Sequence, residues 1–203
     1  MSTQETIGCL YLHGFLSSPE SGKAQEVARY YARHLCSEQL SIPVLPFAPV
    51  EAITLAAAEL TRLQSRYPQV YIIGSSLGGF YATWLAQTHK VRAVVVNPAV
   101  RPHELFRHYI GPNRHYYTGE VHDLTTDHLD QLAAIAVSEI QQPQNLLLMA
   151  QTGDQTLDYR HALALYHACP QLIEEGGSHT FDGFIEHMPT ILAFAATGRY
   201  RGG

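Results

Sequence analysis

The sequence predicts an α/β fold, with about six mainly parallel strands in one sheet and helices on both of its faces. Short apolar runs of strand length alternate along the chain with stretches in which apolar residues recur every three or four positions. The run AVVV at 93–96 has no polar alternation, which is typical of a parallel strand buried on both faces. With 203 residues, the chain is expected to form one domain, 1–203.

Six segments have the length and composition of strands. Strands that alternate with helices form parallel units, and such sheets bind ligands beyond the carboxyl ends of their strands. The functional residues are therefore expected in the loops that follow these segments. The predicted strands are 7–12, 42–47, 70–74, 92–97, 145–151 and 171–174.

Between these strands, apolar residues recur at helical spacing, which predicts helices. Asp158 is placed to cap one helix at its N-terminus. The last helix is predicted to begin near Asp182, to kink at Pro189 and to end at Gly198. The apolar stripes are Val27, Tyr31 and Leu35; Ile53, Ala56, Leu60 and Leu63; Phe80 and Trp84; and Tyr159, Leu163 and Tyr166.

One segment, from about 100 to 142, is too long for an ordinary connection between a strand and a helix. It is rich in His and Tyr. We expect a crossover helix together with a small lid.

Composition excludes several classes of function. The net charge of −5 offers no basic face for nucleic acid. No run of 18 apolar residues predicts a membrane span, and the N-terminus lacks the pattern of a signal peptide. Three scattered Cys residues are typical of reduced thiols, so a cytoplasmic location is expected. Nothing in the sequence indicates the oligomeric state.

The sequence GSSLG at 74–78 matches the G-x-S-x-G nucleophile elbow. It follows an apolar strand-like run and precedes a helical pattern, as that tight turn requires. Glycine is needed on both sides because the turn brings backbone segments very close together. Ser76 is the central serine, so Ser76 rather than Ser75 is the candidate nucleophile of an α/β-hydrolase fold.

A serine hydroxyl needs a base, and the base needs an orienting carboxylate. In this fold the chain order is Ser, then Asp or Glu, then His. His179 follows the last predicted strand, which makes it the candidate base among twelve His residues. Asp154 follows the preceding strand and is the preferred carboxylate, and Asp158 is the alternative.

The oxyanion formed in acyl transfer needs backbone N–H donors. One donor is expected from Leu77, the residue after the nucleophile, and the other from Phe15 in the loop after the first strand. Gly14 would let that loop approach a substrate. His13 precedes Ser76 in the chain, so it is expected to hold the loop by hydrogen bonds and to line the pocket.

No phosphate loop, dinucleotide fingerprint or H-E-x-x-H motif is present. The His residues between 100 and 142 lack i, i+4 pairs and Cys partners, which argues against a zinc site. We therefore expect neither a metal nor a cofactor.

Five blocks together resemble the small bacterial esterases typified by YqiA and YcfP. They are 11–19 (YLHGF and SSP), 74–84 (GSSLGG and YATW), 94–102 (VVVNPAVRP), 151–160 (QTGD and LDYR) and 175–179 (EGG and H). The resemblance implies a compact α/β-hydrolase and esterase or thioesterase activity on short acyl groups or acyl-CoA.

The resemblance also implies a triad of Ser76, Asp154 and His179. Ser178 stands before His179, where relatives are expected to carry Asn. The segment 100–142 matches less cleanly, so the resemblance does not extend to substrate preference.

The expected function is hydrolysis of a small-molecule carboxylic ester or thioester through an acyl-enzyme, as in carboxylesterases. The alternatives are acyl transfer or a lyase reaction by the same triad, or a non-catalytic binding protein on this scaffold. Four aromatic residues of the long segment either wall an acyl pocket or simply pack over the sheet edge. They are Phe106, Tyr109, Tyr116 and Tyr117.

Overall fold

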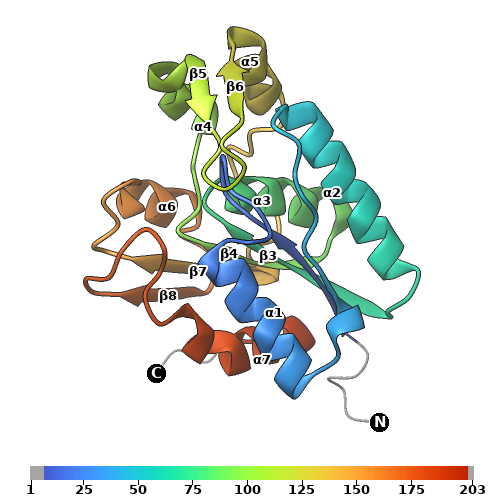
Figure 1. Ribbon diagram of the computed structural model, residues 1–203. Coiled ribbons are helices and arrows are strands. Elements are labelled where there is room, and N and C mark those ends of the chain that lie inside the picture. Colours follow the sequence, from blue (N-terminus) through green and yellow to red (C-terminus); the bar gives the residue numbers. More distant parts are fainter. Residues whose placement is uncertain (1–6, 201–203) are drawn as a thin grey trace.

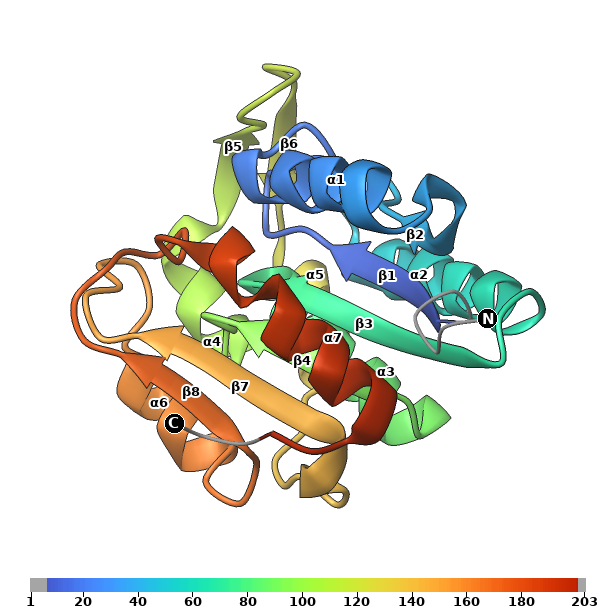
Figure 2. The same ribbon diagram turned by 90° about the horizontal axis from the view of Figure 1, so that it is seen from below.

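The computed structural model describes residues 7–200 and contains one six-stranded sheet with every neighbouring pair parallel. The strand order is β2-β1-β3-β4-β7-β8 (Figures 1 and 2). This arrangement confirms the predicted α/β fold class. The strands are β1 (Ile7–Leu12), β2 (Leu40–Ser41), β3 (Gln69–Ser75), β4 (Arg92–Val96), β7 (Leu146–Gln151) and β8 (Gln171–Glu174).

Helices cover both faces of the sheet (Figures 1 and 2). One face packs against α1 (Gly22–His34) and α7 (Met188–Thr197), and the other mainly against α2 (Pro49–Gln64), α3 (Leu77–His89) and α6 (Tyr159–Leu165). Successive residues of β4 enter the two cores in turn, which explains its unbroken apolar sequence. Between residues 7 and 200, no helix has the length and apolarity to cross a membrane.

The second predicted strand, 42–47, is wrong. Only the two residues of β2 pair with β1, and the chain then leaves the sheet. Pro43 and Pro46 have no N–H to donate to a ladder, which explains why the apolar run does not continue as a strand. Val44 is 68% exposed, whereas Leu45 and Phe47 are partly buried against the core without pairing in the sheet.

The prediction for the last helix is also partly wrong. A 3₁₀ turn at Phe184–His187 comes first, and α7 begins only at Met188. Pro189 lies in the first turn of α7, where its missing N–H costs no hydrogen bond, so it does not kink the helix. Gly198 ends α7 with φ of 70°, as predicted.

The segment 100–142 contains α4 (Pro102–Leu105), a 3₁₀ turn at Phe106–Tyr109, an antiparallel pair and α5 (Thr126–Ala134). The pair, β5 (Gly111–Arg114) and β6 (Val121–Leu124), projects beyond the carboxyl ends of the main strands (Figures 1 and 2). We call β5, β6 and the turn between them the lid hairpin. Its turn contacts the loop after β1.

Two hydrogen bonds join the lid hairpin to that loop. The Tyr116 N–H donates to the Leu16 carbonyl oxygen at 3.1 Å, and the His115 ring Nε2 lies 2.9 Å from the Ser17 carbonyl oxygen. The lid hairpin is thereby tied to the loop that carries Phe15.

Candidate active site

Ser76 occupies the turn between β3 and α3 and has φ of 56° and ψ of −120°. This conformation is strained for a residue with a side chain, at a cost of about 1–3 kcal/mol. A Cβ on Gly74 would overlap the Gly78 carbonyl oxygen, and one on Gly78 would overlap the Leu12 carbonyl oxygen. The glycines of the motif are therefore required by close backbone packing.

Backbone hydrogen bonds hold this turn in place. The Ser76 N–H donates to the Val96 carbonyl oxygen at 3.0 Å. The Ser76 carbonyl oxygen accepts from the Ala99 N–H at 3.0 Å and from the Gly79 N–H at 2.9 Å. Contacts from β4 and the loop after it thus stabilise the strained residue.

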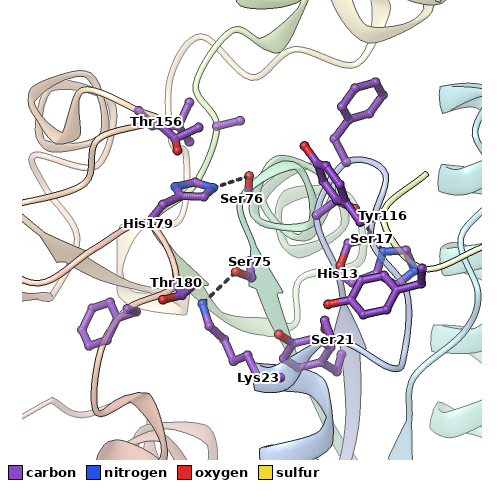
Figure 3. A pocket seen from close by; sticks show the side chains of 18 of the residues that line it. His13, Ser17, Ser21, Lys23, Ser75, Ser76, Tyr116, Thr156, His179 and Thr180 are labelled. Carbon is purple, nitrogen blue, oxygen red and sulfur yellow. Dashed lines mark hydrogen bonds between the residues drawn. The ribbon is translucent and has the colours of Figure 1, made fainter. Parts of the chain in front are cut away.

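Ser76, His179 and Asp154 lie in one hydrogen-bonded line. The His179 Nε2 is 3.1 Å from the Ser76 Oγ, and the His179 Nδ1 is 2.7 Å from the Asp154 Oδ2. Figure 3 shows His179 pointing at Ser76. The structure thus brings together three residues that are 103 and 25 positions apart in the chain.

The environment of Asp154 determines the protonation of the imidazole. Burial alone would raise the pKa of this carboxyl, whose side chain is 1% exposed. Hydrogen bonds from His179 and from the N–H groups of Leu157 and Thr156 outweigh that effect and hold the pKa below its ordinary value. An ionised carboxylate only accepts, so His179 carries its proton on Nδ1 and presents the Nε2 lone pair to Ser76.

Asp158, the alternative carboxylate, has a different role. It is the N-cap of α6, where its Oδ1 accepts from the Arg160 N–H at 3.0 Å. Its Oδ2 also accepts from the Arg160 guanidinium at 2.6 Å. This confirms the predicted cap, and within residues 7–200 no hydrogen bond or ion pair joins Asp158 to His179.

Ser75 has a different hydrogen-bond partner from Ser76. Its side chain is buried, and its Oγ accepts a hydrogen bond from the Lys23 Nζ at 2.9 Å (Figure 3). The two adjacent serines therefore point to different partners, and only Ser76 contacts His179.

The loop after β1 closes over Ser76 from the other side. A Cβ on Gly14 would lie 3.6 Å from the Ser76 Oγ, so the backbone there passes close to the Ser76 hydroxyl. The N–H groups of Phe15 and Leu77 have no hydrogen-bond acceptor within the described part of the chain. Both are thus available as oxyanion donors.

His13 is buried and holds this loop by two hydrogen bonds. Its Nδ1 donates to the Gly14 carbonyl oxygen at 3.0 Å, and its Nε2 accepts from the Leu45 N–H at 3.2 Å. Burial lowers the pKa of His13, so the neutral ring that these two bonds require is favoured.

Asn97 positions the loop that carries His179, and sequence reasoning assigned it no role. Its side-chain amide donates to the carbonyl oxygens of Ser178 and His179, both at 3.0 Å, and its Oδ1 accepts from the Gln151 N–H. Asn97 is buried and has φ of 40°, which asparagine tolerates better than most residues.

Gln151 holds the same loop from β7. Its Oε1 accepts from the N–H groups of Ser178 and Asp182, and its Nε2 donates to the Asp182 carbonyl oxygen and the Glu174 carboxylate. Both residues have amide side chains: Asn97 immediately follows the buried strand β4, and Gln151 is the last residue of the buried strand β7. That change from apolar to amide is the signal that could have revealed them.

A cavity of about 760 Å³ opens beside Ser76 and His179. The five side chains expected in a pocket all line it: His13, Phe106, Tyr109, Tyr116 and Tyr117. Phe106 packs on Phe15, with ring centroids 4.6 Å apart, whereas Tyr116 remains 75% exposed at the rim. The aromatic residues thus form one wall of the cavity, and hydroxyl groups and Lys23 line another part.

A family model described as "Uncharacterised protein family (UPF0227)" matches residues 8–196. The chain belongs to this family. The match confirms the resemblance to the YqiA and YcfP type that the sequence motifs indicated.

Solved structures share the fold at low sequence identity. One from the metagenome-derived lipolytic enzymes LipS and LipT has a TM-score of 0.69 and 18% identity, covering 94% of each chain. The esterase domain of a Rhodothermus marinus protein scores 0.65 at 17% identity, covering 97% of this chain and 89% of that one. A monoacylglycerol lipase of Paleococcus ferrophilus scores 0.63 at 15% identity, covering 94% of each chain. The fold is thus that of α/β hydrolases.

Proposed function

We propose that this protein is a serine hydrolase that cleaves carboxylic esters or thioesters of small molecules through an acyl-enzyme. The observation that carries the proposal is the line Ser76–His179–Asp154, with its distances of 3.1 and 2.7 Å, at the wall of a cavity. Esterases and lipases among the proteins of similar fold support it.

In the first half-reaction, the Ser76 Oγ attacks the acyl carbonyl carbon while the His179 Nε2 accepts the hydroxyl proton. Asp154 stabilises the imidazolium that forms. The carbonyl oxygen becomes an oxyanion held by the N–H groups of Phe15 and Leu77, and each donor contributes about 3 kcal/mol to the transition state.

Collapse of this intermediate breaks the bond from carbon to the leaving oxygen or sulfur, and His179 protonates the departing group. Water then attacks the acyl-Ser76 ester with His179 as base, and the acid is released. The strained backbone of Ser76 keeps its Oγ exposed to the cavity, so no rearrangement of the turn is needed between the two half-reactions.

The test is hydrolysis of 4-nitrophenyl butyrate at pH 8 by the wild type and by Ser76→Ala. The variant is expected to lose at least ~10³-fold in kcat, given the size of triad effects. Ser75→Ala is the matched control, because the neighbouring hydroxyl contacts Lys23 and not His179. Equal activity of wild type and Ser76→Ala would contradict the proposal.

A fluorophosphonate probe gives a second readout that is independent of substrate choice. Labelling is expected on Ser76 in the wild type and absent in Ser76→Ala. Folded protein that remained unlabelled would refute the assignment of Ser76 and favour a binding protein on this scaffold. A rate that rises with added alcohol acceptor, with the acyl group recovered on the acceptor, would instead indicate acyl transfer.

A further inference from the structure

Lys23 is placed unusually for a lysine. The chain has only two lysines, and the other, Lys90, lies at the C-terminal end of α3. Lys23 lies in the first turn of α1, is partly buried and lines the cavity that contains Ser76. Its Nζ donates to the Ser75 Oγ at 2.9 Å (Figure 3). The Nζ also lies 5.4 Å from the centroid of the Phe184 ring.

This ammonium has no carboxylate partner within ion-pair distance in residues 7–200. Glu26, on the same helix, and Asp154, on the loop after β7, act on it only from farther away. The other carboxylate and imidazole side chains that line the cavity in residues 7–200 are the exposed Asp182, His13 and His179. An ammonium has three donors, and the Ser75 hydroxyl occupies one of them.

Holding a cation in this place is costly to the free protein. Burial lowers the pKa of Lys23 to about 7, although Glu26 and Asp154 act in the opposite direction. Methionine would fill the same space without this cost. Since Ser75 needs no charged donor for its single hydrogen bond, the folding of α1 does not explain a lysine here.

We propose that the cavity binds substrates that carry a carboxylate, and that Lys23 pairs with this carboxylate next to the reacting ester. The inference rests on the proposed function and extends it to a class of substrate. Ser75 directly precedes Ser76, so a carboxylate at the Lys23 Nζ lies only a short chain away from the carbonyl that Ser76 attacks. The first turn of α1 contains no acidic residue, and the positive end of the helix adds to the attraction.

A single carboxylate suits the site better than a phosphate monoester. Within residues 7–200, Lys23 is the only Lys or Arg that lines the cavity, whereas Glu26 and Asp182 also line it. A dianion would be repelled by both carboxylates, while a monoanion can be neutralised by Lys23 alone. The hydroxyl group of Ser21, which lines the cavity too, provides a further donor.

The test compares matched esters that differ only in charge. On the acyl side, 4-nitrophenyl hydrogen adipate is compared with its neutral methyl ester. On the alcohol side, 3-carboxyphenyl butyrate is compared with the corresponding methyl 3-hydroxybenzoate ester. The quantity measured is the ratio of kcat/KM between the charged and the neutral member of each pair.

The wild type is expected to prefer the charged member of one pair by about tenfold or more, the size of one charge-assisted hydrogen bond. The pair that shows the preference identifies whether the acyl or the alcohol side reaches Lys23. In Lys23→Met the ratio should fall to about 1 or below, mainly through KM, and Lys23→Arg should recover part of it. Lys90→Met is the matched control and should keep the wild-type ratio.

Ratios near 1 in both pairs for the wild type, or a preference that Lys23→Met retains, would overturn the inference while leaving the proposed hydrolysis intact. A binding measurement tests the carboxylate site at Lys23 independently of the proposed hydrolysis. Monomethyl adipate is titrated calorimetrically into Ser76→Ala and into Ser76→Ala combined with Lys23→Met. Binding that requires Lys23 supports the carboxylate site even if no ester is cleaved, and equal affinities would contradict it.

Discussion

Replacing Asp154 by asparagine tests the proposed role of the carboxylate without changing its shape. The Asp154 Oδ1 accepts from the N–H groups of Thr156 and Leu157, both at 2.8 Å, and its Oδ2 faces the His179 Nδ1 at 2.7 Å. In the variant, the two backbone donors keep the amide oxygen at the Oδ1 position. The amide NH₂ is then forced toward His179.

That orientation reverses the tautomer of the imidazole. The His179 Nδ1 must accept from the new NH₂ group, so its proton moves to Nε2, the atom 3.1 Å from the Ser76 Oγ. A protonated Nε2 cannot remove the serine proton. The expected loss in kcat is about 10⁴-fold, which corresponds to about 5 kcal/mol in the activation barrier.

The assay is hydrolysis of 4-nitrophenyl butyrate at pH 8, with Asp158→Asn as the matched control. Asp158 caps α6, so its variant should lose at most about 1 kcal/mol of stability and keep its kcat within a few-fold of the wild type. If Asp154→Asn retained more than a tenth of wild-type kcat while folding normally, the tautomer argument would be refuted. A larger loss in Asp158→Asn than in Asp154→Asn would reverse the assignment of the two carboxylates.

Three further perturbations follow from the packing around the site. Asn97→Ala removes the two hydrogen bonds to the backbone of the His179 loop. For 4-nitrophenyl butyrate, kcat should therefore fall at least about tenfold with little change in KM, and urea unfolding should show a free energy of unfolding lower by about 1–3 kcal/mol. A change in KM alone would contradict this role. Gly78→Ala places a Cβ against the Leu12 carbonyl oxygen, and circular dichroism should show a large loss of thermal stability, whereas a melting temperature equal to that of the wild type would show that the elbow can relax. Lys23→Met should be more stable than the wild type at pH 6, by at most a few kcal/mol. This gain should vanish as the pH rises from about 7 toward 10.5. In that range Lys23 is protonated only in the unfolded wild-type chain, so the stability of the wild type increases with pH. Urea unfolding of both proteins across this pH range measures the difference, and a gain that did not depend on pH would contradict a buried cation at that position.

The parts of the site that could be predicted from the sequence are those in which neighbouring residues determine the structure. The turn at Ser76 follows from two glycines and two flanking apolar patterns, since a tight strand-to-helix turn excludes side chains at both glycine positions. The burial of β4 on both faces follows from its composition in the same way. His179 and Asp154 were predicted from their places after strands, because parallel strands bring their carboxyl ends to one edge of the sheet.

Two predictions from local sequence patterns were wrong because backbone hydrogen bonding mattered more than amino-acid composition. The apolar run 42–47 has the composition of a strand, yet Pro43 and Pro46 deprive it of donors. Pro189 was expected to interrupt a helix, but the helix begins one residue earlier and accommodates it. In both cases the position of proline relative to the element boundary decided the outcome, and boundaries depend on tertiary packing.

The sequence by itself determined the fold class, the tight turn at Ser76 and the chain order Ser76, Asp154, His179 of the three hydrogen-bonded residues. Only the tertiary structure showed that Asn97 and Gln151 hold the His179 loop and that Lys23 reaches Ser75, 52 positions away. The physical reason is that neighbouring residues determine whether a segment forms a strand or a tight turn. A hydrogen bond between distant side chains depends instead on the strand order and on how the helices lie against the sheet. Neither of these is encoded in the spacing of the residues that meet.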